Sequence, residues 1–192
     1  MHGLILYCIE MFIRDRRGDS AWADVAQSGG FERHGFDAFR HYPPDTLARL
    51  IGAGSARLGL EPSEFLDDLG QWLTMIEQVR RILRFSGSCY ADFILALEYL
   101  HLRGEMTLPG LDLPQIRAAR RGAGGFRLEI GDGPPEWAAV ICGITRAMAD
   151  DFGALACVSA EGRLIEIEIS DDAFSPGRDF SLTPALSETG TG

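Results

Sequence analysis

The chain is organised around residues 90–114, which read YADFILALEYLHLRGEMTLPGLDLP. At helical spacing, most of the apolar side chains of this stretch and a single histidine, His101, share one broad face, while the charged side chains lie opposite. We therefore expect His101 to point inward near the end of a helix, before a loop that contains Pro109 and Pro114. An inward histidine is either a core residue bonded to a neighbouring carbonyl or a metal or haem-iron ligand. The helix alone leaves both interpretations open.

The size and charge of the chain limit the classes of function. A length of 192 residues fits one domain with a sizeable core and space for a cavity. The net charge of −10 argues against nucleic acid or an anionic membrane as the main partner, because both favour a basic protein face. Small molecules and other proteins remain as partners.

The cysteines and the hydropathy pattern point to a soluble protein of the reducing cytoplasm. The four cysteines are irregularly spaced and form no paired motif for zinc or redox chemistry. The apolar run at residues 4–9 is too short to span a bilayer, and we find no signal peptide.

Hydrophobic periodicity predicts a first half made almost wholly of helices. We expect helices over about residues 4–18, 19–28, 45–59, 63–85 and 88–104. Gly18 and Gly59 are expected to end helices, and Asp45 and Ser88 to cap them. Ser63 is expected to start the long fourth helix, with a bend near Gly70.

The second half is expected to be mixed. Alternating apolar residues predict strands at 126–130, 154–159 and 163–170, and a helix is expected at 137–152. The last two strands should form an antiparallel hairpin, while Arg117, Arg120 and Arg121 form a basic cluster in a solvated turn. The predicted class is therefore α+β, as one domain over residues 1–170, with a largely mobile end at 171–192.

Four short motifs along this domain resemble one known family. They are MHGL at 1–4 with SAW at 20–22, LGQW at 69–72, LEYLHL at 97–102 with LPGLDLP at 108–114, and ICGI at 141–144. In this order and spacing the chain is similar to the haem nitric oxide/oxygen binding family, H-NOX, which includes the sensor domain of soluble guanylate cyclase. The resemblance implies the H-NOX fold, a haem b cofactor, and His101 as the axial ligand of the haem iron.

The resemblance also implies the walls of the haem site. The expected contacts are Ile5, Leu73, Leu97, Pro114, Val140 and Ile144. Each of these side chains is equally explained as ordinary core. Val140 stands near the place where oxygen-binding members of the family have a tyrosine. Bound oxygen needs a hydrogen-bond donor, whereas nitric oxide binds ferrous haem tightly in an apolar pocket, so nitric oxide is the expected ligand.

The chain departs from the family at the site of the haem propionates. The family holds them with a Tyr-x-Ser-x-Arg motif, and the matching positions here are Ile130, Asp132 and Pro134. A propionate near a buried pocket needs donors and a cation, whereas Asp132 offers a like charge. The loss is expected to cost on the order of several kcal/mol of haem affinity. Arg127 or the basic cluster would have to reach the propionates from another direction.

Two functions follow from these patterns. The first is a haem-based gas sensor acting on a separately encoded partner, such as a histidine kinase or a cyclic-nucleotide enzyme, because the chain has no room for an output domain. The second is a haem-free H-NOX-like module for protein interaction or for another apolar ligand, which the missing propionate motif favours. An enzyme is not indicated, since no nucleophile with a base and no phosphate loop is found.

Overall fold

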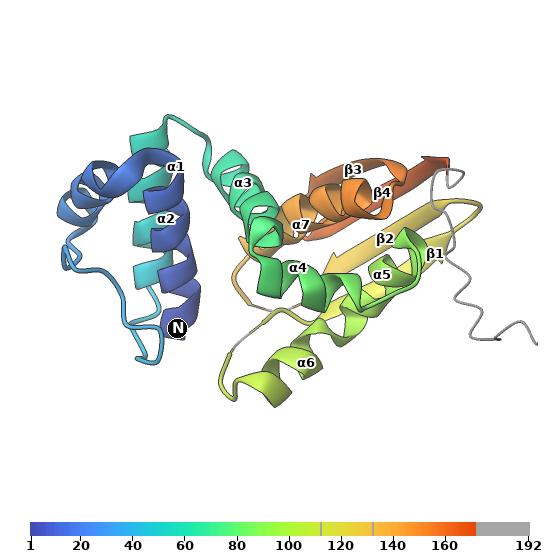
Figure 1. Cartoon of the computed structure of the whole chain (residues 1–192), viewed down its shortest axis with the longest axis horizontal. Coiled ribbons are helices and arrows are strands. Elements are labelled where there is room, and N and C mark those ends of the chain that lie inside the picture. The colour runs from blue at the N-terminus through green and yellow to red at the C-terminus, as the bar shows by residue number, and fades with distance from the viewer. Residues whose placement is uncertain (112, 132, 172–192) are drawn as a thin grey trace, which may run out of the picture.

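The computed structural model describes residues 1–111, 113–131 and 133–171. Its helices are α1 Gly3–Gly29, α2 Thr46–Leu58, α3 Pro62–Met75, α4 Glu77–Arg84, α5 Tyr90–Ala96, the 3₁₀ turn η1 Leu97–Tyr99, α6 Leu100–Thr107 and α7 Trp137–Phe152. Its strands are β1 Ile116–Arg121, β2 Gly125–Ile130, β3 Leu155–Glu161 and β4 Leu164–Asp171. In Figure 1, α1 and α2 stand on one side, the sheet lies on the other, and α3 runs between them. The predicted α+β class is confirmed.

Two expectations concern the membrane and the end of the chain. Within the described ranges, no helix has the length and apolar character needed to cross a bilayer. The expected mobile end of the chain falls on residues 172–192, which lie outside the described residues, as does Asp132.

The first predicted helix boundary is confirmed as a kink inside α1. Gly18 has non-helical backbone angles, with φ of 81° and ψ of 172°, which a residue without a side chain adopts at little cost. The two arms of α1 therefore pack in different directions and bury Phe12 and Ile13 on the first arm and Trp22 and Val25 on the second.

The bend predicted near Gly70 is wrong. The long helix breaks instead at Ile76, where extended backbone with φ of −72° and ψ of 114° separates α3 from α4. Gly70 stays helical because it meets α7, and a Cβ atom there would lie 2.2 Å from the carbonyl oxygen of Val140. Gly143 on α7 is placed in the same way, since its Cβ would lie 2.0 Å from the carbonyl oxygen of Asp67. The two glycines let the backbones of α3 and α7 touch.

Of three predicted helix starts, one is confirmed in position. Asp45 is the N-cap residue of α2, but its side chain makes no capping bond and pairs with Arg49 at 3.5 Å. α3 begins after Glu61, whose capping box replaces the expected start at Ser63. The Ser88 hydroxyl donates to the Asp92 carboxylate at 2.6 Å instead of capping α5. Asp45 and Ser88 are thus each bonded to a nearby charged side chain and not to the helix backbone.

The sheet is antiparallel with strand order β1-β2-β4-β3. The expected β3–β4 hairpin is confirmed, with Gly162 at φ of 58° in its turn. The expectation that the basic cluster lies in a turn is wrong, because these arginines belong to the edge strand β1. Their pairing with β2, and the packing of the Arg120 guanidinium 5.0 Å from the Phe126 ring, explain why polar residues form this strand.

The segment that contains His101 is not one regular helix. It consists of α5, the η1 turn and α6, and its buried side chains lie in α5 and η1. α6 buries no residue fully, and His101 is half-buried, so the expected inward position is met only in part. Figure 1 shows α6 projecting from the lower edge of the molecule.

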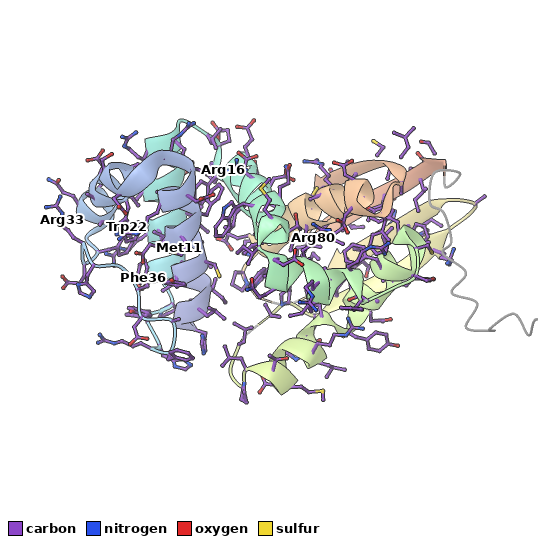
Figure 2. All side chains as sticks on the ribbon, viewed as in Figure 1. Met11, Arg16, Trp22, Arg33, Phe36 and Arg80 are labelled. Carbon is purple, nitrogen blue, oxygen red and sulfur yellow. The ribbon has the colours of Figure 1, made fainter. Side chains whose placement is uncertain are left out.

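A polar network that the sequence did not reveal holds the loop at 31–43 against α1. The buried Glu10 carboxylate accepts hydrogen bonds from Arg14 Nε at 2.8 Å and from the backbone N–H of Phe36 at 2.7 Å. Trp22 Nε1 donates to the Arg33 carbonyl at 3.1 Å, and the Trp22 and Phe36 rings lie 5.8 Å apart (Figure 2). The loop has little regular structure, yet its position is fixed.

Candidate functional site

A cavity of about 370 Å³ lies between the helical half and the mixed half of the molecule. α1, α2, α3, α4, η1, α6 and α7 all contribute to its walls, together with the loop residues that precede β1 and α7. The lining is almost wholly apolar. A concave apolar site of this size lies in the range of small-molecule pockets, roughly 300–1,000 Å³.

Most of the side chains predicted to surround a haem lie on this cavity. The residues that do so are Ile5, Leu73, Leu97, Val140 and Ile144. They come from α1, α3, η1 and α7, so only folding brings them together. Pro114 is buried just before β1 but does not belong to the lining.

Several lining residues were not predicted. Among them are the residues from α2 and α4, two helices for which no contact was predicted: Leu47, Ile51, Val79, Ile82 and Leu83. Nothing in the sequence separates these side chains from ordinary helix core, because periodicity marks an inner face without telling whether that face meets protein or empty space.

His101 lies beside this cavity and is held by one hydrogen bond. Its Nδ1 atom is 3.0 Å from the carbonyl oxygen of Leu113. A carbonyl oxygen can only accept, so Nδ1 carries the proton and Nε2 of the neutral ring keeps its lone pair. Such a bond is typical of a metal-ligating histidine oriented by a backbone carbonyl, and it also satisfies a structural histidine. His101 is not itself a lining residue, whereas Leu100 and Gly104 on the same helix are.

The two hydroxyl groups on the cavity wall are engaged within the protein. The Ser86 hydroxyl lies 3.1 Å from the Ile82 carbonyl, and the Thr107 hydroxyl donates to the Arg103 carbonyl at 2.8 Å. Arg103 Nη1 donates to the Ser86 hydroxyl at 2.5 Å. Burial raises the pKa of the Cys8 thiol to about 11, which keeps it neutral.

One acceptor on the cavity wall is left over. Oε2 of Glu136, immediately before α7, is buried and has no hydrogen-bond partner in the described part of the chain. The sequence analysis did not single out this carboxylate, because Glu136 follows two prolines at the start of the predicted helix and carries no motif.

Of the positions that match the family's propionate motif, the two that the structure describes offer no replacement donor. Ile130 is buried in β2, and Pro134 lines the cavity. Arg163 holds the intervening loop by donating to the carbonyls of Gly131 and Gly133. Arg127 was expected as a substitute cation, but it does not line the cavity and is paired with Glu166 on the sheet.

The basic cluster of β1 does not line the cavity either. Of the described residues, Arg103 is the one arginine that does.

These residues fit haem in two respects and resist it in a third. The apolar lining suits a macrocycle, and the His101 ring is oriented by its hydrogen bond to the Leu113 carbonyl. For the two propionates, the described cavity wall offers one cation, Arg103, and one opposing carboxylate, Glu136. The site therefore fits a haem held mainly through the iron and the ring.

Comparison with known proteins supports the same assignment. The family model described as haem-NO-binding matches residues 2–130. The soluble guanylate cyclase gcy-31 of Caenorhabditis elegans is 26% identical over 132 residues, which make up 67% of this chain and 19% of that protein. The chain thus spans about a fifth of this relative.

Solved structures show the fold. An H-NOX protein from S. oneidensis superposes with a TM-score of 0.76 at 15% identity, over 91% of this chain and 99% of that chain. A mutant of the T. tengcongensis H-NOX superposes with a TM-score of 0.73 at 16% identity, over 91% of this chain and 100% of that chain. The expected H-NOX arrangement of helices and sheet is confirmed.

Proposed function

The chain belongs to the haem-NO-binding family, and on that premise we propose that it is a haem-based nitric oxide sensor domain that acts on a separate signalling protein. Domains of this family are sensor domains and are not catalytic themselves. The observation that carries the proposal is the oriented His101 ring beside an apolar cavity whose lining includes most of the predicted contacts.

His101 would hold the iron of a haem through Nε2, while the Leu113 carbonyl keeps the ring in the required tautomer. Leu97, Val140 and Ile144 would contact the ring and exclude water. A bound ferrous haem supplies an iron that takes up diatomic gases.

The wall chemistry favours nitric oxide over oxygen. Bound oxygen requires a hydrogen-bond donor, and the hydroxyls of Ser86 and Thr107 are already engaged with carbonyls of the protein. Val140 and Ile144 present only apolar surface from α7. Nitric oxide binds without such a donor, so it suits the apolar surface that Val140 and Ile144 present.

The helix of His101 suits the transmission of a signal. α6 buries no residue fully, and it approaches the loop before β1 closely, because a Cβ on Gly104 would lie 2.5 Å from Leu113 Cδ1. A displacement of His101 would thus be shared by α6 and by Leu113, to which the ring is bonded. A partner such as a histidine kinase or a cyclic-nucleotide enzyme would respond to the shift between two such positions of α6.

Absorption spectra of the full chain test this proposal. After incubation with haem and gel filtration, the ferrous protein should keep a Soret band that shifts with nitric oxide. The change H101A should abolish the band while leaving the far-UV circular dichroism intact, and H34A, which removes an exposed histidine, should change neither. A well-folded wild-type chain that retains no haem would refute the sensor proposal.

A second function is favoured by the unpartnered Glu136 oxygen and by the missing propionate motif. In this case the chain is a haem-free H-NOX-like module that binds another apolar ligand or a protein. The same spectra distinguish the two, because the second function predicts no retained Soret band.

A further inference from the structure

The carboxylate of Glu136 belongs to the same wall as the apolar residues of α7. Glu136 immediately precedes α7, and Val140 and Ile144 follow it by four and eight residues on one helical face. All three line the cavity, which places the Glu136 carboxylate beside apolar side chains of α7.

No group of the described chain satisfies this spot. Oε2 of Glu136 is buried without a hydrogen-bond partner within the described ranges, and the residue makes no capping bond to α7. Arg103, on the cavity wall, donates to the Ser86 hydroxyl. Arg163, immediately before β4, donates to the carbonyls of Gly131 and Gly133.

A carboxylate oxygen accepts hydrogen bonds and donates none. A buried carboxylate oxygen without a donor is costly, and a ligand that supplies the donor recovers that cost. The apolar walls around it would hold the rest of such a ligand.

We propose that Glu136 makes this cavity a binding site for an apolar ligand with a protonated amine as its head group. The amine donates to Oε2 of Glu136, and its hydrocarbon part contacts Val140, Ile144 and the other apolar walls. This ligand class lies beyond gas sensing. The proposal concerns the haem-free chain, so its test is independent of the test of haem binding.

A matched set of probes tests the proposal. Octylamine, octanol and octanoate share one hydrocarbon tail and differ in head group. Calorimetry can measure their affinities for the haem-free full chain. The measurement is made at high salt, because salt screens the general attraction of a chain with a net charge of −10 for cations. Wild-type protein should bind octylamine more tightly than octanol and about tenfold to a hundredfold more tightly than octanoate.

Two variants locate the preference. The change E136Q should reduce the ratio of octylamine to octanoate affinity by about tenfold. The change E98Q removes the same charge from an exposed position and should leave the ratio as it was.

The order of the three affinities is measured on wild-type protein, so this part of the test does not depend on whether a variant folds. Equal affinities for octylamine and octanoate would overturn the proposal, as would a preference that E136Q leaves unchanged. Either result would mean that water satisfies Glu136 and that the carboxylate selects no ligand.

Discussion

Replacing Gly143 with alanine should loosen the contact on which the cavity depends. A Cβ at this position would lie 2.0 Å from the Asp67 carbonyl oxygen, whereas ordinary contacts begin near 3.4 Å. The backbones of α3 and α7 must therefore separate by roughly 1.4 Å, and a helix backbone cannot yield as a flexible side chain does.

The energetic effect can be set against a matched control. Overpacking costs typically about 1–3 kcal/mol or more, and the better helix propensity of alanine returns at most about 1 kcal/mol. Because the clash is with backbone, we expect G143A to lose at least about 2 kcal/mol of unfolding free energy, or roughly 4–8 °C in melting temperature. Gly52 lies on the exposed side of α2, where an added Cβ would meet no atom within 4 Å, so G52A should gain up to about 1 kcal/mol.

The same change should alter ligand binding. Leu69 and Leu73 on α3 and Val140 and Ile144 on α7 all line the cavity, so moving the two helices apart changes its width. Thermal and urea unfolding followed by circular dichroism measure the stability of G143A and G52A beside wild-type protein. A G143A chain as stable as wild type would refute the view that direct backbone contact holds α3 against α7.

Glu10 is 3% exposed and should stabilise the fold of the first half. The change E10Q weakens its pairing with Arg14 and should lower the free energy of unfolding in urea by about 1–3 kcal/mol. An unchanged urea midpoint would contradict this role. Burial raises the pKa of Cys8 and of Cys142 from 9.0 to about 11, so the unfolded chain releases these protons first as the pH rises. Stability should therefore fall between about pH 9 and pH 11, and the double change C8A/C142A should flatten that part of the curve. At neutral pH a thiol reagent should modify the exposed Cys157 before Cys8 or Cys142, and simultaneous labelling of the three would contradict the burial.

Local patterns in the sequence determined much of the fold. The apolar spacing of residues 137–152 and the alternation at 164–170 were sufficient to predict α7 and the β3–β4 hairpin, because both depend on periodicity and on glycines that accept positive φ. Four short motifs in order, including the one around His101, were sufficient to identify the family.

Tertiary structure decided what these patterns left open. Gly70 reads as a bend in the sequence, but its role is to admit the backbone of α7, a partner about seventy residues away. β1 contains too many arginines to be read as a strand, and its pairing with β2 supplies the hydrogen bonds that make it one. Glu136 carries no motif in the sequence, and only the packing of α7 against the other walls leaves its oxygen buried without a donor in the described chain. Periodicity shows which face of an element is turned inward, but whether that face meets protein, a ligand or an empty cavity depends on atoms far away in the chain.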